Sequence, residues 1–504
     1  MWFAGLTAAA AAFVVYLATL APTLTFQHWG SDGGDLIAAA RTLGIPHPPG
    51  YPTYTLMAWL ATQLPFGSIA YRANVLSAAC TACAVGLLYV TLQTLVSCRR
   101  GGWLPAGVAS LALGFAPLAW SQAVIAEVYA TALCFASLTF FLVIRWRSGG
   151  ADVLLWLAAL VFGLGLGVHS TLAFFLLPAL ILLWPLRARW RRRRVLLPGF
   201  ILFAAGLAVF AYLPLAASHR PPVNWGDPEQ GRRFLWVVTG ALYQPLILGL
   251  PASGLFPRLS DWARLVAIQF GWFGWALALL GLPQILRRDR ALGIASIAWV
   301  GGVALFALLY NSTDSFVYLL PVMLMPALWL CTGVAYLLEQ AKHLNRWAAA
   351  ALSALLLLIP AVSLVNHWVE IDLRGDRSAR IYVDQVLAAI DSHGLALVQG
   401  DQATFSLWYA LYAEGQRQDI VVVNTNLLGF DWYRATLRET YAQLEIPEPG
   451  GEAAGPHDQV RELIIRNYLS RPVYALDPSS EWQAWFDIAQ EGAAPVYRVL
   501  VRSR

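Results

Sequence analysis

Residues 31–52 read SDGGDLIAAARTLGIPHPPGYP, and they follow an apolar run over residues 2–20. Asp32 and Asp35 lie at the start of a predicted helix, where the positive end of the helix dipole favours carboxylates. His47 lies in the HPPGYP turn, where the prolines fix φ and the glycine permits a tight bend, so we expect its side chain to be held in place. A simpler interpretation makes Asp32 an N-cap and Asp35 part of the same cap region.

The composition of the chain indicates an integral membrane protein. Of 504 residues, 58% are apolar and 12% carry a charge, whereas a soluble domain has about 25% charged residues. The first apolar run has no basic n-region and no clear cleavage site, so we expect a retained helix rather than a removed signal peptide. A helix needs about 20 residues to cross the hydrocarbon. We predict an α-helical polytopic protein with about eleven transmembrane helices, near residues 2–22, 70–97, 103–119, 122–144, 152–168, 170–186, 195–216, 262–286, 291–310, 315–338 and 346–366.

Basic residues between the apolar runs set the predicted topology. With a cytoplasmic N-terminus, the inner loops hold fifteen basic residues and the outer segments before residue 367 hold seven, as the positive-inside rule expects. Topology therefore accounts for the formal charge of +5, and nucleic acid is not an expected partner. The inner set is Arg99, Arg100, Arg145, Arg147, Arg187, Arg189, Arg191, Arg192, Arg193, Arg194, Arg287, Arg288, Arg290, Lys342 and Arg346; the outer set is Arg41, Arg72, Arg220, Arg232, Arg233, Arg258 and Arg264.

The acidic residues of the membrane region gather on the outer side of this topology. Acids contribute little to topology. An ionisable group at membrane depth is energetically costly, so it is by default a candidate functional residue. We therefore expect the functional site at the outer face, where two outer segments are long, residues 23–69 and 217–261. The outer acids are Asp32, Asp35, Glu127, Asp227, Glu229, Asp261 and Asp314, and the inner ones are Asp152, Asp289 and Glu339.

The composition changes to that of a soluble domain after about residue 368. Strand-like runs alternate with helical stretches there, which predicts a small α/β domain over residues 368–504, separate from a transmembrane domain over residues 1–367. An odd number of spans places this domain outside the cytoplasm. The predicted strands are residues 395–400, 419–424, 471–476 and 496–502.

Three motifs carry a resemblance to a known family. They are DGGD at 32–35, TLGIPHPPGYP at 42–52 and AYRANVLSA at 70–78, and QAVIAEVYA (122–130), NWGDP (224–228) and STDSFVYLLP (312–321) fit as well. With these motifs the chain resembles the bacterial and animal protein O-mannosyltransferase-like membrane proteins of the GT-C superfamily. The resemblance is strong from residue 1 to about residue 330 and weaker in the C-terminal domain. One departure is Asp35, which is often Glu in that family.

The resemblance implies a GT-C-like fold and transfer of a sugar from a polyprenyl-phosphate donor at the outer face. Such a reaction needs a general base for the acceptor hydroxyl and positive charge for the departing phosphate. We expect Asp32 to be the base with Asp35 as its catalytic partner, and Arg72, with Arg41 second, to contact the phosphate. Arg72 is equally well explained as an interfacial arginine that extends to the headgroups.

Other polar and aromatic residues are expected to bind substrate, each with a structural alternative. Glu127 either pairs with Arg72 or lines a wet cavity, His169 can be a satisfied structural histidine, and a rigid NWGDP loop needs no ligand. No metal motif is present, because Asp32 and Asp35 alone supply too few ligands, although a divalent metal stays open. The predicted substrate-binding set is His47, Arg72, Glu127, His169, Asn224, Trp225, Asp227, Tyr243, Asp314 and Tyr318.

The sequence thus predicts a hexosyltransferase without a resident cofactor, in the bacterial cytoplasmic membrane. It would move a hexose, mannose by resemblance, to a hydroxyl acceptor such as a protein Ser or Thr; a glycolipid or surface glycan is the alternative acceptor. A transporter or flippase of lipid-linked sugar is the competing class, but transporters place their charges at the bilayer midplane between repeats, and no repeat is visible here. A non-catalytic scaffold for the C-terminal domain is a third interpretation.

Overall fold

The computed structural model describes residues 1–96, 102–448, 456–491 and 495–502. The predicted inner-loop residues Arg99 and Arg100 lie outside these ranges. The described chain forms two compact units, each built from three segments. Unit 1 comprises Met1–Leu20, Asn74–Phe210 and Tyr243–Arg374, and unit 2 comprises Ala21–Ala73, Ala211–Leu242 and Gly375–Arg504.

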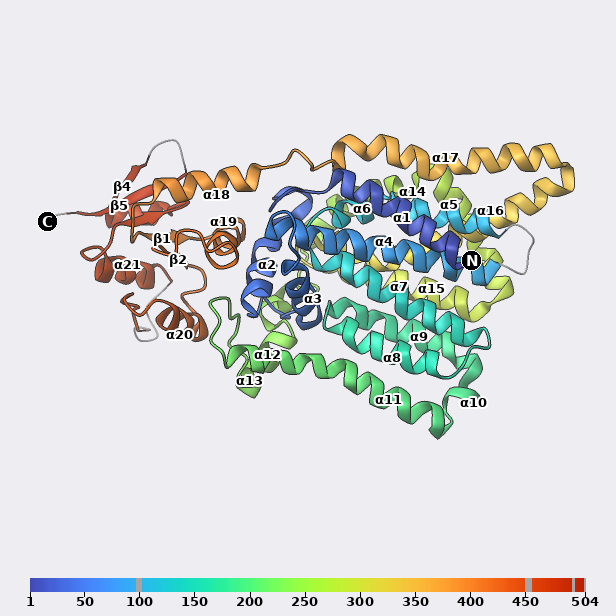
Figure 1. Cartoon of the computed structure of the whole chain (residues 1–504), viewed down its shortest axis with the longest axis horizontal. Helices are drawn as coiled ribbons and strands as arrows, with labels where there is room; N and C mark the ends of the chain where they lie inside the picture. The colour runs from blue at the N-terminus through green and yellow to red at the C-terminus, as the bar shows by residue number, and fades with distance from the viewer. Residues whose placement is uncertain (97–101, 449–455, 492–494, 503–504) are drawn as a thin grey trace. The chain divides into compact units, whose positions relative to one another are not determined.

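Unit 1 is a bundle of helices, seen at the right of Figure 1. Its helices are α1 (Trp2–Thr19), α4 (Ile69–Val96, whose first residues belong to unit 2), α5 (Trp103–Gly114), α6 (Pro117–Ala123), α7 (Val128–Arg147), α8 (Val153–Leu166), α9 (Leu176–Leu183), α10 (Arg187–Trp190), α11 (Arg193–Leu207), α14 (Ala252–Arg288), α15 (Arg290–Leu309), α16 (Leu324–Leu344) and α17 (Arg346–Ile371). Short 3-10 turns extend several of them: η2 (Ser170–Phe175), η3 (Trp184–Leu186), η4 (Ala208–Ala211), η5 (Ala241–Leu246), η6 (Ser315–Leu319) and η7 (Pro321–Met323).

An apolar helical segment lies at each of the predicted transmembrane positions. Within the described ranges, nine are long and apolar enough to span a membrane, and a tenth is formed if α5 and α6, bent by 61° at residues 115–116, count as one span. The remaining position is α8, which has 14 residues and is short for a span of about 20. Burial separates central from peripheral helices, since the apolar window of Ser315–His343 is 94% buried and that of Arg346–Ile371 is 11% buried. The protein is an integral membrane protein.

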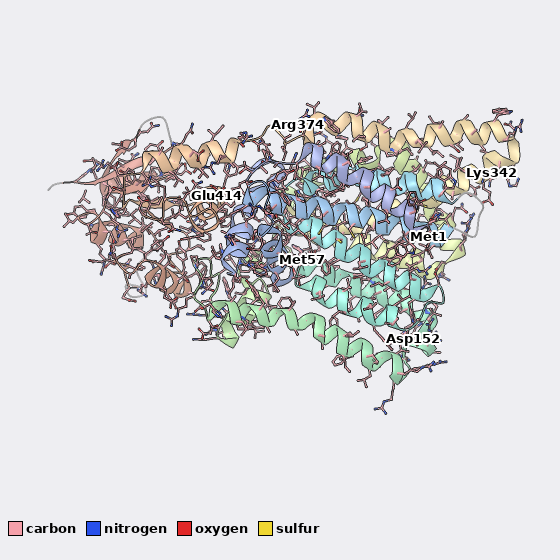
Figure 2. All side chains as sticks on the ribbon, in the orientation of Figure 1. Met1, Met57, Asp152, Lys342, Arg374 and Glu414 are labelled. Carbon is pink, nitrogen blue, oxygen red and sulfur yellow. The ribbon has the colours of Figure 1, made fainter. Side chains whose placement is uncertain are left out.

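Three of the loops predicted to be cytoplasmic meet at one end of unit 1. Arg147 binds both carboxylate oxygens of Asp289, at 2.8 and 3.1 Å. Asp152 accepts hydrogen bonds from the Trp146 indole at 3.0 Å and from Arg189 at 2.7 Å. Figure 2 labels Asp152 at this end of the bundle, where α8 begins. The loops around residues 147, 189 and 289 therefore share one side, as the predicted alternation requires.

Unit 2 combines the two long outer segments with the C-terminal residues. Its helices are α2 (Gly33–Thr42), α3 (Pro52–Thr62), α12 (Tyr212–Ala217), α13 (Gly231–Val238), α18 (Ser378–Ala389), α19 (Asp401–Trp408), α20 (Asp431–Thr440) and α21 (Pro456–Asn467), with the short turns η1 (Gln27–Asp32), η8 (Tyr409–Ala413) and η9 (Ser480–Ala484). Contacts between distant segments hold it together: Thr25 donates a hydrogen bond to Asp376, and Phe26 packs edge-on against Tyr382 with ring centroids 5.8 Å apart.

The sheet of unit 2 has five strands in the order β2-β1-β3-β5-β4. The strands are β1 (Leu395–Val398), β2 (Val421–Asn424), β3 (Val473–Ala475), β4 (Phe486–Gln490) and β5 (Tyr497–Val501). β1 pairs in parallel with β2 and β3, and β5 pairs antiparallel with β3 and β4. All four predicted strands are present. The edge strand β4 was not predicted from the sequence, because most of its side chains are exposed or half-buried and it lacks a buried apolar run.

Candidate active site

The Asp35 carboxylate is the centre of a buried cluster in unit 2. Its side chain is completely buried, and both of its oxygens accept hydrogen bonds. Oδ2 accepts from the backbone N–H of His47 at 2.9 Å and from the His47 ring at Nδ1 at 2.8 Å. Oδ1 accepts from the Trp225 indole N–H at 3.0 Å. These three hydrogen bonds offset the free-energy cost of burying the charge. The bond from Nδ1 fixes the orientation of the His47 ring.

The other nitrogen of His47 points towards Asp32 and Tyr51. The Tyr51 hydroxyl lies 3.1 Å from Nε2, and the nearer carboxylate oxygen of Asp32 lies 3.7 Å from it. The Asp32 side chain is 32% exposed, whereas that of His47 is 8% exposed. Asp32 occupies the N-cap position of α2, but its side chain makes no capping hydrogen bond. Its carboxylate therefore lies beside the histidine ring and is partly exposed to solvent.

The charge of His47 follows from its neighbours. Burial disfavours the imidazolium, but the carboxylates of Asp32, Asp35 and Asp401 outweigh burial and raise the pKa of His47 to about 9. The ring is therefore protonated at neutral pH and donates from both nitrogens. The row Asp35, His47, Asp32 thus places one positive charge between two carboxylates, one buried and one accessible.

The local chain path explains how the two outer segments meet at this cluster. Gly44 lies against the second outer segment, where a Cβ at position 44 would come within 2.3 Å of the Val223 carbonyl oxygen. Ile45 donates its N–H to Val223 at 2.8 Å and accepts from Trp225 at 3.2 Å. This short parallel bridge brings the Trp225 indole to Asp35. The peptide bond between Pro48 and Pro49 is cis.

Helix α19 of the C-terminal segment completes the cluster. The Phe405 ring stacks on His47, with centroids 6.3 Å apart and ring planes 12° apart. α19 lies alongside α2 in Figure 1, and this approach requires Gly34, where a Cβ would lie 2.3 Å from the Phe405 carbonyl oxygen. The pKa of Asp401, the first residue of α19, is raised overall. Burial is the main cause, the charge of Asp35 adds to it, and the charge of His47 partly offsets it. Asp401 and Phe405 were not among the residues selected from the sequence.

The remaining predicted residues of unit 2 have structural contacts of their own. Arg72 donates to the carbonyls of residues 62 and 66 at 2.7 Å and of residue 67 at 3.1 Å, which closes the end of α3. These bonds use three of the five N–H donors of the guanidinium, and the contact of phosphate with Arg72 stays a prediction. Asp227 forms an ion pair with Arg233 and accepts from the Asn224 amide at 3.3 Å. The roles of Asn224, Trp225 and Asp227 in binding sugar likewise stay predictions.

Five predicted residues lie in unit 1. Two of them, His169 and Tyr318, form an aromatic cluster with the ring of Tyr129. His169 lies 5.3 Å from Tyr129 and 5.4 Å from Tyr318, centroid to centroid. The predicted set in this unit is Glu127 (2% exposed, at the N-cap of α7), His169 (5% exposed), Tyr243 (in η5), Asp314 (bonded to the Ser312 hydroxyl) and Tyr318 (in η6). Their contact with substrate stays a prediction.

The helical bundle with a small C-terminal sheet defines the class of protein. The structure matches that of ArnT from Cupriavidus metallidurans bound to undecaprenyl phosphate, with a TM-score of 0.60, 14% sequence identity and coverage of 98% of this chain and 97% of that chain. The apo structure of the same ArnT gives a TM-score of 0.55 at 13% identity, over 97% of this chain and 96% of that chain. The fold is therefore that of ArnT, and the α-helical polytopic architecture with a small C-terminal α/β domain is as predicted.

The sequence comparisons show which proteins this chain is similar to. Residues 32–193 match the family model described as "Protein O-mannosyl-transferase TMEM260 N-terminal domain", and residues 379–453 match "TMEM260-associated domain 2". The chain is 27% identical to the protein O-mannosyl-transferase TMEM260 of Mus musculus over 465 residues, and 22% identical to its counterpart in Dictyostelium discoideum over 521 residues. These matches confirm the predicted resemblance: the chain is similar in sequence to the TMEM260-type protein O-mannosyltransferases.

The matches cover most of this chain but less of its relatives. They include 86% of this chain against the mouse protein and 92% against the Dictyostelium protein. The chain spans 64% of the first and 62% of the second, which is less than two thirds of either relative.

The raised pKa of His47 predicts a pH dependence of folding stability. The ordinary histidine value of 6.5 applies to the unfolded chain, and the folded value is about 9. The stabilisation from the protonated ring is therefore fully present below about pH 6.5 and is lost as the pH rises through about 9. We expect the thermal unfolding midpoint of the wild type to fall over this window. In a His47→Gln variant the fall should be smaller, and an identical pH profile would contradict the assignment.

The close approach of α2 and α19 predicts a strong effect of a single methyl group. Gly34→Ala would force the added carbon against the backbone of Phe405, and we expect a loss of about 1–3 kcal/mol of stability, typical of overpacking. Gly400→Ala is the matched control in the same unit, because nothing lies within 4 Å of its added carbon. Differential scanning fluorimetry of both variants measures the difference, and equal midpoints would contradict the packing.

Proposed function

We propose that this chain is a membrane hexosyltransferase that moves mannose from a polyprenyl-phosphate donor to a hydroxyl acceptor at the extracytoplasmic face. The main support is the partly exposed Asp32 carboxylate, whose Oδ2 lies 3.7 Å from Nε2 of the buried His47. The names of the relatives, protein O-mannosyl-transferases, support mannose and a protein Ser or Thr acceptor. The undecaprenyl phosphate in the matching ArnT structure supports a lipid-phosphate donor.

In the proposed reaction, Asp32 acts as the general base. The acceptor oxygen attacks the anomeric carbon of mannose, its proton passes to Asp32, and the bond from that carbon to the phosphate oxygen breaks. The products are an inverted glycoside and polyprenyl phosphate. General-base catalysis of this kind contributes about 100- to 10,000-fold to a rate. The phosphate is a good leaving group, so the protein needs no acid at the departing oxygen.

The structure supports different roles for the two acids near α2. Asp35 is fully buried and its oxygens are occupied by His47 and Trp225, so it cannot reach an acceptor. We assign it a positioning role: it holds His47, and His47 orients Asp32. Asp401, whose charge also acts on His47, would help keep that ring protonated. Phe405 covers one face of the ring and limits the access of water.

Reconstitution tests the proposal and separates the possible acceptors. Purified protein in proteoliposomes is supplied with labelled polyprenyl-phosphate mannose, or with labelled nucleotide mannose, together with candidate acceptor proteins and glycolipids. We expect label from the lipid donor alone, on Ser or Thr of protein. Label on glycolipid would support the alternative acceptor class. Movement of donor between leaflets without transfer would contradict the enzyme and support a flippase.

A further inference from the structure

The turn between two membrane spans of unit 1 is unusually basic. Residues 187–194 read RARWRRRR, and we name them the arginine turn. They lie between the spans Ser170–Trp190 and Arg193–Ala217, so the turn must sit at a surface of the bilayer whichever way the protein is oriented. α10 and the start of α11 form this turn at the lower right of Figure 1.

One arginine of the turn, Arg189, makes structural contacts within unit 1. Arg189 binds Asp152 through Nε at 3.0 Å and Nη2 at 2.7 Å, and its guanidinium lies 4.5 Å from the Trp146 ring centroid. The nearby acid Asp289 is bound by Arg147 in the same way. The carboxylates of Asp152 and Asp289 are therefore occupied.

The other five arginines are exposed, and only the charge of Arg194 acts on a nearby acid, Asp152, among the described residues. They make no ion pair with any acid in the described part of the chain; they are Arg187, Arg191, Arg192, Arg193 and Arg194. The positive-inside rule accounts for basic residues in this loop, and exposed guanidinium groups that form no ion pair in the described part of the chain also concentrate positive charge at the membrane surface. The excess of positive charge therefore indicates a negatively charged partner outside the chain.

Two tryptophans make cation–π contacts with two of these arginines. Arg187 and Arg191 lie 5.5 and 5.8 Å from the ring centroid of Trp184, and Arg191 also lies 5.6 Å from that of Trp190. Cation–π contacts at exposed sites are worth about 0.5–1 kcal/mol each. The Trp184 side chain is itself 55% exposed, and tryptophan prefers the headgroup level of a bilayer. The guanidinium groups are thus arranged at the depth of the lipid phosphates.

We propose that the arginine turn binds the phosphate headgroups of anionic phospholipids in the leaflet that it contacts. A guanidinium presents a planar fork of donors that matches two phosphate oxygens, and clusters of basic residues beside a membrane helix attract anionic lipid. The partner is lipid rather than a soluble anion because the two flanking spans and Trp184 fix the turn at the headgroup level. This site is separate from the transfer reaction, and it would anchor α11 and α8 to the leaflet.

Ligand-induced stabilisation tests the site. Detergent-solubilised full-length protein is titrated with short-chain phosphatidylglycerol, short-chain phosphatidylcholine or inorganic phosphate, and the thermal unfolding midpoint gives an apparent Kd because a ligand of the folded state raises it. The test variant is Arg187→Gln/Arg191→Gln/Arg192→Gln. The control variant, Arg287→Gln/Arg288→Gln/Arg290→Gln, removes the same charge from three exposed arginines around the Asp289 loop.

We expect phosphatidylglycerol alone to raise the midpoint. The test variant should bind it about 100-fold more weakly, since each of the three removed basic residues contributes about 1 kcal/mol, while the control variant binds as the wild type does. Trp184→Ala, which keeps every charge, should weaken binding by a smaller factor. Equal loss in the test and control variants would show a diffuse surface charge and overturn the proposal. An equal response to inorganic phosphate would overturn the assignment to lipid.

Discussion

Asp32→Asn is expected to lower the rate of mannose transfer by about 100- to 10,000-fold, the contribution of a general base. The amide has nearly the shape of the carboxylate but cannot accept the acceptor proton. Asp32 is partly exposed and makes no capping bond, so its replacement should lower the thermal unfolding midpoint only modestly, through the loss of its charge beside His47. Initial rates with labelled polyprenyl-phosphate mannose measure the effect.

Asp261→Asn is the matched control for this substitution. Asp261 is an exposed acid of α14 that also falls on the predicted outer side, and it has no place in the proposed reaction. We expect its variant to transfer mannose at the wild-type rate. If the two variants lost activity equally, the loss would reflect negative charge at the outer face rather than a base at position 32.

Asp35→Ala is expected to destabilise unit 2 by about 3–5 kcal/mol, the cost of leaving one member of a buried ion pair without its partner. Its carboxylate is fully buried against His47, and the variant would leave both the imidazolium and the Trp225 indole without their acceptor. Transfer should be lost together with stability. Thermal unfolding monitored by intrinsic fluorescence, compared between Asp35→Ala and Asp32→Ala, measures the difference.

The comparison of these two alanine variants separates a base from a positioning residue. Asp32→Ala should lose only a little stability, through the loss of its charge beside His47, and be inactive, whereas Asp35→Ala should be both much less stable and inactive. A stable but inactive Asp35→Ala would instead favour direct participation of Asp35. A stable and fully active Asp35→Ala would remove the buried carboxylate from the account altogether.

The sequence predicted the membrane part of the fold because its signals are local. Apolar runs of about 20 residues and basic loops between them need no knowledge of tertiary contacts. The short β4 was missed because an edge strand with exposed side chains carries no such pattern. The kink that separates α5 from α6 was missed for a related reason, since the apolar run continues through residues 115 and 116 without a break in composition.

The candidate site was only partly readable from the sequence. Asp32, Asp35 and His47 share one motif within 16 residues, so their proximity could be expected. Trp225 was predicted to contact sugar, but the structure shows it donating to Asp35, a contact across 190 residues that no motif records. Asp401 and Phe405 come from a helix with no catalytic signature, and only the packing of Gly34 against α19 brings them to His47.

The most direct test of Asp32 as the general base measures donor binding and transfer in the same sample of the Asp32→Asn variant. Purified variant and wild type are loaded with labelled polyprenyl-phosphate mannose, separated from free donor and then mixed with acceptor. We expect the variant to retain bound donor at the wild-type level and to transfer label at the background rate. Transfer from Asp32→Asn at the wild-type rate would contradict the assignment of Asp32 as the base.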